Sequence, residues 1–272
     1  MEELSAQGIV IREKPSGEAD KIITVLTAEH GKVCALAKGV RNLSNKNAAA
    51  CQLFVYSEYQ FVTKGNRRIL KTALSKDVFF GMRSDAERFS LVSYFAEILG
   101  HVTMENNDET QTLRLFLNVV YAISNKTDIP LWVIKAAFEL KLMCVLGFMP
   151  DFAEFGCCSN QAYLSKSNIF SFEQGALLCE KCCSESRRTY GSVPYSCTLP
   201  QDVVRAMIYI CKSETKKILS FKLDTSYSNE LAFVCENYLI HKTERSYETL
   251  KIYKSIVNSL KLINTEKNEE QK

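Results

Sequence analysis

The sequence predicts an α+β fold in which a small five-stranded closed barrel is followed by an all-helical domain with an inserted zinc-ribbon-like segment. Three observations support this prediction. Short β-branched and aromatic runs separated by glycine turns occupy residues 5–80. Apolar residues recur at helical spacing after Gly81. Five cysteines cluster within residues 157–183, between helical stretches.

The first eighty residues contain five predicted strands. Their boundaries follow from turn signals at Lys14–Gly17, His30–Gly31 and Lys64–Asn66. The strands are expected at 9–11, 21–27, 32–37, 54–62 and 67–71. Residues 39–47 are polar and basic, which is typical of an exposed loop. The aromatic residues of the fourth strand alternate poorly for one face, so we interpret most of them as core rather than as stacking platforms for bases: Phe54, Tyr56, Tyr59 and Phe61.

Beyond residue 80 the sequence predicts helices. A capping box at Ser84–Glu87, with Ser84 as the N-cap, begins the first long helix. Further helices are expected near 113–123, from Pro130 to Leu146, from Leu199 to Lys212 and over 228–245. The predicted organisation is a barrel at 1–80, a helical domain at 81–149 and 191–245, a zinc-ribbon-like insertion at 150–190, and an amphipathic C-terminal segment with a disordered polar tail at 246–272.

The cysteine cluster indicates a metal site. Cys179 and Cys182 form a CxxC pair, whose thiolates can bind one tetrahedral zinc ion from a tight turn. The partner pair would be Cys157 and Cys158, which are adjacent, because Phe155 stands where a first CxxC would begin. The predicted cofactor is therefore one structural Zn²⁺ ion. The alternative is a ribbon that no longer binds zinc and keeps its cysteines as small buried residues.

Bulk composition indicates a soluble globular chain, with 46% hydrophobic and 24% charged residues. No signal peptide opens the sequence, and no run of eighteen apolar residues is long enough to span a membrane. The six remaining cysteines lie in apolar contexts, which favours reduced core residues in a reducing cytosol over a disulfide framework: Cys34, Cys51, Cys144, Cys197, Cys211 and Cys235.

The net charge of +3 is unevenly distributed, since residues 31–76 carry nine Lys and Arg residues against one acid, Glu58. Such an excess is typical of a surface that binds a polyanion, although a solvated basic face without a partner has the same composition. The predicted nucleic-acid contacts are Lys32, Lys38, Arg41, Lys46, Arg67, Arg68 and Lys71. Contacts to phosphates carry no base information, so this site would bind independently of sequence.

Catalysis is poorly supported. The three histidines are far apart in the sequence, and the GxSxG, HExxH and P-loop patterns are all missing from it. Two readings compete with a nucleic-acid binder. One is a zinc-ribbon module that contacts only proteins, and the other is a hydrolase without a short signature.

Two N-terminal strings resemble the RecO family of bacterial recombination mediators: residues 8–27 (GIVIREKPSGEADKIITVLT) and 29–41 (EHGKVCALAKGVR). The likeness continues through Leu146–Pro150, Gly175–Cys182 and Tyr238–Arg245, and covers roughly residues 5 to 255. The zinc-bearing members of that family have two CxxC pairs and other members lack zinc, so the departure at Phe155 concerns the metal and leaves the fold unaffected.

The resemblance implies an N-terminal OB-fold and a helical domain with a zinc ribbon. It implies a cytoplasmic, nucleoid-associated, non-enzymatic protein that binds single- and double-stranded DNA and anneals complementary strands. Its implied protein partners are RecR, with which it helps RecA load, and the acidic C-terminal tail of the single-strand-binding protein SSB. Lys38 and Arg41 match the positions where the family has basic DNA contacts, so we expect these two residues to be the foremost contacts.

Overall fold

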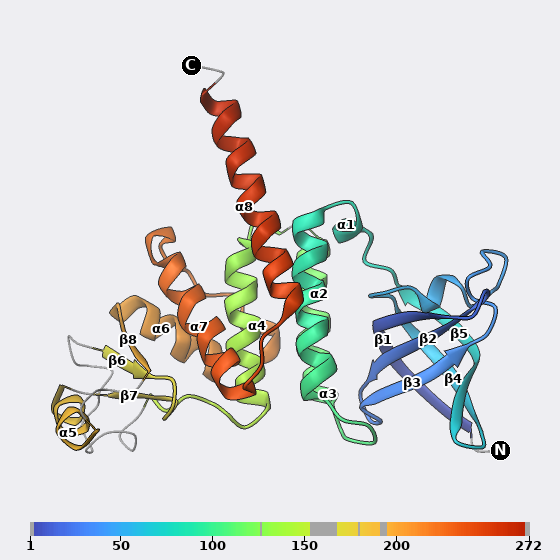
Figure 1. The fold of residues 1–272 in the computed structure, drawn as a ribbon, viewed down its shortest axis with the longest axis horizontal. Helices are drawn as coiled ribbons and strands as arrows, with labels where there is room; N and C mark the ends of the chain where they lie inside the picture. Colours follow the sequence, from blue (N-terminus) through green and yellow to red (C-terminus); the bar gives the residue numbers. More distant parts are fainter. Residues whose placement is uncertain (1–2, 126, 153–167, 179, 191–194, 270–272) are drawn as a thin grey trace. The chain divides into compact units, whose positions relative to one another are not determined.

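A computed structural model describes residues 3–125, 127–152, 168–178, 180–190 and 195–269 (Figure 1). The chain forms two compact units, one of residues 1–127 together with 247–272 and one of residues 128–246. We call them the barrel unit and the helical unit. Residues 81–127, expected to belong with the later helices, thus fall in the barrel unit.

The barrel unit begins with five strands that close on themselves in the order β1-β2-β3-β5-β4. Only β3 and β5 pair in parallel, and the other neighbours are antiparallel. This confirms the predicted five-stranded barrel, whose strand order is OB-like. The strands are β1 (Glu3–Ser16), β2 (Asp20–Thr27), β3 (Lys32–Ala37), β4 (Tyr56–Lys64) and β5 (Arg67–Asp77). A short 3₁₀ helix, η1 (Ala49–Cys51), precedes β4.

Side chains from all five strands fill the interior of the barrel. Tyr59 and Phe61 of β4 are buried and stack with their ring centroids 5.6 Å apart, as expected for core aromatics. The fourth strand begins at Tyr56 rather than at the predicted Phe54. Phe54 has φ of 61°, and its backbone N–H donates to Val10 O at 2.9 Å. This left-handed turn buries the Phe54 ring before the strand begins, which a pattern of aromatic residues cannot reveal.

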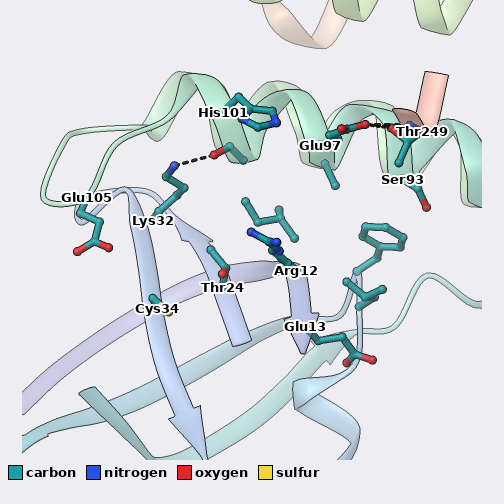
Figure 2. Close-up of a pocket in the computed structure, with 15 residues that line it drawn as sticks. Arg12, Glu13, Thr24, Lys32, Cys34, Ser93, Glu97, His101, Glu105 and Thr249 are labelled. Carbon is teal, nitrogen blue, oxygen red and sulfur yellow. Dashed lines mark hydrogen bonds between the residues drawn. The ribbon is translucent and has the colours of Figure 1, made fainter. Parts of the chain in front are cut away.

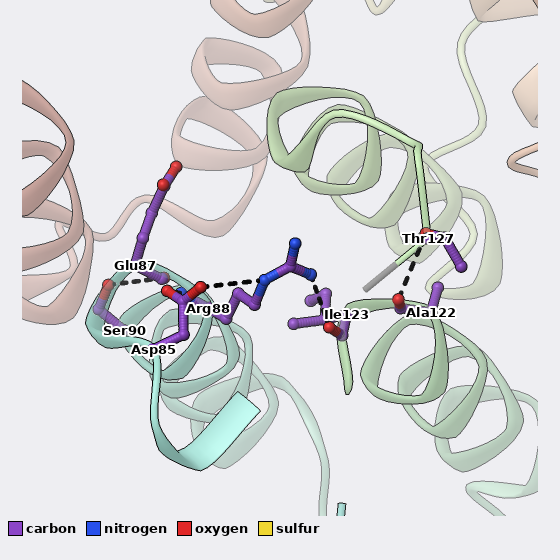
Figure 3. A network of polar contacts seen from close by, with 7 residues as sticks. All are labelled: Asp85, Glu87, Arg88, Ser90, Ala122, Ile123 and Thr127. Carbon is purple, nitrogen blue, oxygen red and sulfur yellow. Dashed lines mark hydrogen bonds and ion pairs between the residues drawn. The ribbon is translucent and has the colours of Figure 1, made fainter. Parts of the chain in front are cut away.

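Three helices and the C-terminal helix complete the barrel unit: α1 (Phe80–Arg83), α2 (Ala86–Val102), α3 (Thr110–Ser124) and α8 (Glu248–Glu269). The N-cap of α2 is Asp85, not the predicted Ser84, because Ser84 closes α1 and the Asp85 carboxylate accepts from the Arg88 backbone N–H. The Arg88 side chain then joins α2 to α3. It donates to Asp85 at 3.1 Å and to Ile123 O at 2.7 Å (Figure 3).

The turn between β2 and β3 attaches the barrel to the loop between α2 and α3. Lys32 N donates to Met104 O at 2.9 Å, Asn106 N to His30 O at 2.9 Å, and Glu109 N to Ala28 O at 2.6 Å. Gly31 lies at the centre of this junction with φ of 60°. Backbone bonds in both directions therefore hold the barrel on the helical part of its own unit.

Helix α8 packs along α2, as Figure 1 shows for the red helix α8 and the teal helix α2. Tyr247, Leu250 and Tyr253 are buried there. The Glu97 carboxylate of α2 accepts from the N–H of Thr249 at 2.9 Å and from its hydroxyl, so α2 caps the N-terminus of α8. The helix continues to Glu269, into the polar tail predicted to be disordered from residue 264. Lys and Glu are good helix formers, and extending an existing helix is far less costly than starting one.

The described part of the helical unit contains four α-helices, three of which pack together, and a small three-stranded sheet. Helix α4 packs against both α6 and α7, and the strands have the order β7-β6-β8. The elements are α4 (Leu131–Val145), β6 (Asn168–Ser171), β7 (Ala176–Leu178), α5 (Glu180–Tyr190), β8 (Ser196–Leu199), α6 (Gln201–Lys212), η3 (Thr215–Lys217), η4 (Thr225–Tyr227) and α7 (Ser228–Thr243). Helices were predicted to begin near Pro130 and Pro200. This is confirmed, since the two prolines are the N-caps of α4 and α6.

Candidate nucleic-acid interface

A groove of about 680 Å³ lies on the outer face of the barrel, between the β1–β2 turn and the β4–β5 turn. Strands β2 and β3 form its floor. This is the part of an OB-like barrel that typically receives a nucleic-acid strand. The groove is lined by Ser16, Ile22, Cys34, Ala35, Leu36, Thr63, Gly65, Asn66, Arg67, Arg68 and Glu105. We call it the barrel groove.

The strand register places residues of this face in two rows across the sheet. One row is Arg12–Thr24–Cys34, and the other is Lys14–Ile22–Leu36–Ile69. Neighbouring strands lie about 5 Å apart, so the second row crosses about 15 Å. Arg12 and Lys14 are both exposed at the β1 edge. Each row thus begins with a cation and continues over small, thiol or apolar side chains.

The loop after β3 brings three predicted contacts to one rim of the face. Lys38, Arg41 and Lys46 are exposed. The Arg41 guanidinium donates to Gly17 O at 2.8 Å, and its backbone N–H donates to Ala19 O at 3.0 Å. These bonds hold Arg41 beside the β1–β2 turn, while the four other N–H groups of its guanidinium keep the capacity to bind an anion.

Two predicted contacts lie at the β4–β5 end of the groove. Arg67 is exposed, and Arg68 is half-buried with its guanidinium 3.3 Å from the Asn106 side-chain oxygen. Both residues line the barrel groove directly. The parallel register of Leu36 with Ile69 places Arg67 alongside Cys34, at the end of the first row. The face is therefore bordered by cations on both β1 and β5.

Ion pairs already occupy other basic residues of the barrel. Lys71 pairs with Glu3 at 2.7 Å, Lys76 with Glu58 at 3.1 Å, and Lys21 with Glu13 at 2.9 Å. The hydrogen bond and the charge of Lys71 lower the pKa of Glu3, so this pair is ionised at neutral pH. Lys71 is exposed and near the loop of Lys46, but its charge is partly neutralised.

Lys32 lies at the opposite end of β3 from Lys38 and lines a different cavity from Arg67 and Arg68. It begins β3 whereas Lys38 follows the end of that strand, and six residues of strand span about 20 Å. Its ammonium group donates to Gly100 O of α2 at 2.7 Å (Figure 2). It lines a second cavity of about 540 Å³, the α2 cleft, between the barrel and α2.

The α2 cleft has mixed charge. Arg12, Lys32 and His101 line it together with Glu13, Glu97 and Glu105, and Figure 2 shows Arg12 reaching toward the helix. The barrel groove has two arginines against the single carboxylate of Glu105 among its lining residues. A polyanion is attracted more strongly by the second arrangement. We therefore take the barrel groove and its rims as the candidate site.

Arg12, Lys14 and Cys34 belong to this face but are missing from the predicted contacts. The sequence contains a signal that places Arg12 and Lys14 on this face. The Gly17 turn sets the β1–β2 register, and two-residue alternation then places Arg12 and Lys14 on the same face as Thr24 and Ile22. Cys34 was expected in the core and is exposed instead, whereas Cys51, Cys211 and Cys235 are buried as predicted.

The predicted zinc ligands fall largely outside the residues that the structure describes. Cys157, Cys158 and Cys179 lie outside those residues, and Cys182 is half-buried in α5. Within the described ranges, no three metal-binding side chains come together. The zinc site stays a prediction. No helix in the described part of the chain is both long and apolar enough to cross a membrane.

Two family models match almost the whole chain. The model described as "Recombination protein O N terminal" matches residues 1–77, and "Recombination protein O C terminal" matches residues 83–251. The first match covers the barrel with its groove. The second spans α2 to α7 and the start of α8.

Similar proteins agree with these models. A protein named DNA repair protein RecO from Acetivibrio thermocellus is 32% identical over 259 residues, which cover 94% of this chain and 98% of that protein. Proteins of the same name from Alkaliphilus metalliredigens and Caldicellulosiruptor saccharolyticus are 26% and 25% identical, over 93% and 94% of this chain and 99% and 100% of theirs. The likeness therefore extends over both units.

Proposed function

Because the chain belongs to the Recombination protein O family, whose named members are DNA repair proteins, we propose that it is a non-enzymatic recombination mediator that holds DNA in the barrel groove. The substrate class is the sugar–phosphate backbone of single- and double-stranded DNA. The reaction is strand annealing, in which no covalent bond forms or breaks.

The cationic border of the barrel groove supports this proposal most directly. Arg67 and Arg68 line the groove, and Lys38 and Arg41 lie at its rim. Lys14 and Arg12 lie on β1 in the rows that cross the same face, with Arg12 at the neighbouring α2 cleft. Among the described residues, none of these six side chains forms an ion pair with a carboxylate. Phosphates that replace counterions would supply the missing partners, and the released ions favour binding entropically.

The floor of the groove explains why binding would not depend on base sequence. Its lining residues include no aromatic ring, so bases find no stacking platform there. Ile22 and Leu36 offer only apolar contact. With the contacts directed to phosphates, two complementary strands can approach with reduced mutual repulsion while their bases stay available for pairing.

The partners implied by the family resemblance belong to the same proposal. We propose that the chain acts with RecR to load RecA onto DNA covered by SSB, and that it binds the acidic, apolar C-terminal tail of SSB through an apolar surface of its helical part. An amphipathic segment in an apolar groove is a common form of such contacts.

The first test is a salt titration of single-stranded DNA binding by the full chain. If four cations contact phosphates, log K should fall against log salt concentration with a slope of about −3. The double variant Lys38→Glu/Arg41→Glu should bind at least about tenfold more weakly, with the slope reduced by about 1.4, and should anneal strands more slowly.

The control has the same charge change elsewhere. Lys216→Glu/Lys217→Glu alters two exposed lysines of η3 in the helical unit. This variant should leave the salt slope of DNA binding and the annealing rate near those of the wild type, because binding depends on where the cations lie and not on net charge alone. A flat salt response of the wild type would sink the DNA proposal and favour the alternative, a zinc-ribbon module that contacts only proteins.

We also propose one structural zinc ion bound by Cys157, Cys158, Cys179 and Cys182. Elemental analysis of purified chain should give about one zinc per molecule, and Cys182→Ser should lower this content and the melting temperature. Cys34→Ser, which removes an exposed thiol of the barrel, is the matched control and should change neither quantity. Wild-type protein without zinc would contradict the metal and leave the DNA proposal standing.

A further inference from the structure

Two cysteines of the helical unit lie in direct contact across two helices. Cys144 is in the last turn of α4 and Cys211 is in the last turn of α6, and the two thiol groups lie close enough to interact. The two helices pack together. Both thiols are free in the structure.

Lys141 holds the two helix ends in this arrangement. Its ammonium group donates to Cys211 O at 2.9 Å and to Ser213 O at 2.5 Å, so it binds the C-terminal carbonyls of α6. A cation at a helix C-terminus is favoured by the helix dipole. Cys144 lies three residues after Lys141, on the same face of α4. The thiol contact is therefore fixed by a second bond between the same helices.

The two thiols differ in exposure and in acidity. Cys144 is partly exposed whereas Cys211 is buried. The interaction with the Cys211 thiol, aided by the nearby charge of Lys141, lowers the pKa of Cys144 against the effect of its partial burial. The same interaction, together with burial, raises the pKa of Cys211. An accessible, more acidic thiol beside a buried partner is the arrangement of a redox-sensitive pair.

We propose that Cys144 and Cys211 are a redox-modification site, at which peroxides convert the thiol pair into a reversible disulfide that links α4 to α6. Metal binding at this pair is a weaker reading, because the described residues place no third ligand there. Cys235 is fully buried near by and is inaccessible to an oxidant.

The oxidation proceeds in two balanced steps. The Cys144 thiolate attacks one oxygen of hydrogen peroxide, the O–O bond breaks, and Cys144 sulfenic acid and one hydroxide form. The Cys211 sulfur then attacks the sulfur of the sulfenic acid, its proton is lost, and water leaves as the S–S bond forms. Two thiols lose two electrons in total, and one peroxide takes them up to become two waters.

The disulfide would close a loop around residues 144–211, which contain the cysteine-rich segment. Closing a loop restricts the unfolded chain more than the folded one, so oxidation should stabilise the helical unit. Trp132 of α4 is the single tryptophan of the chain, and its fluorescence therefore reports on this unit alone.

The test treats the full wild-type chain with hydrogen peroxide, blocks the remaining thiols with N-ethylmaleimide, and maps the peptides by mass spectrometry. We expect a peptide pair linked through Cys144 and Cys211 that a thiol reductant releases. We also expect the Trp132 melting transition to rise by several degrees on oxidation. Cys144→Ser and Cys211→Ser should both lose the linked peptide and this rise, and Cys34→Ser, the matched control, should keep both.

The Cys211→Ser variant isolates the first step. Without its partner, the Cys144 sulfenic acid should accumulate and react with dimedone, whereas the wild type should show little adduct. If wild-type protein forms no linked 144–211 peptide while Cys34 is oxidised, the proposal is overturned. This outcome is read on wild-type protein, so it does not depend on whether a variant folds, and it leaves the DNA proposal untouched.

Discussion

At the scale of single residues, two glycines of the barrel unit have the same backbone conformation but different surroundings. Gly31 has φ of 60° and Gly65 has φ of 59°, a region in which a side chain is unfavourable. A Cβ atom on Gly31 would collide with Met104 O, whereas a Cβ on Gly65 would meet nothing within 4 Å. Gly31 also lies in the junction between the barrel and the α2–α3 loop.

This pair gives a matched prediction. Gly65→Ala should lower the free energy of unfolding by about 1 kcal/mol, the cost of placing a side chain in a left-handed conformation. Gly31→Ala should cost a further 1–3 kcal/mol, roughly, because the Met104 backbone must move and its bond with Lys32 N weakens. Urea denaturation followed by circular dichroism measures both. An equal loss of unfolding free energy in the two variants would contradict this prediction, because it would show that the Met104 backbone moves away from the added Cβ at no cost.

At the scale of elements, local signals predict regular structure well and its exceptions poorly. The barrel strands and the helices α4, α6 and α7 follow from alternation, helical spacing and the prolines at 130 and 200. The start of β4 and the N-cap of α2 each depend on a choice between near-equivalent neighbours. Phe54 lies in a turn because its backbone N–H donates to Val10 O. Asp85 is the N-cap of α2 because Ser84 is already the C-cap of α1.

The candidate site shows the same division between local and tertiary information. Charge counting locates the basic stretch, and five of its seven predicted contacts lie near the barrel groove or its rim without a carboxylate partner in the described residues: Lys38, Arg41, Lys46, Arg67 and Arg68. Lys32 and Lys71 make contacts with residues 68 positions away in the chain, which local sequence cannot reveal. Arg12 and Lys14 required the strand register.

At the scale of the whole molecule, the barrel unit is discontinuous in sequence. Residues 247–272 belong to it, although the entire helical unit, residues 128–246, comes between them and α3. The link is α8, which buries Tyr247, Leu250 and Tyr253 and takes its cap from Glu97 of α2. The Tyr94 and Tyr247 rings meet edge to face with their centroids 5.8 Å apart. The C-terminal segment therefore contributes to the stability of the N-terminal unit.

A chain truncated after Ser246 should accordingly be destabilised in the barrel unit and much less in the helical unit. Hydrogen exchange of barrel amides should accelerate, while the fluorescence transition of Trp132 in α4 should stay near its wild-type midpoint.

Within the full chain, Tyr253→Ala should lower the free energy of unfolding by about 3–5 kcal/mol because it leaves a cavity beside α2, whereas Ile252→Ala at the exposed neighbouring position should lower it by less than about 0.5 kcal/mol. A truncated chain in which Trp132 loses its transition while barrel exchange is unchanged would place α8 with the helical unit instead.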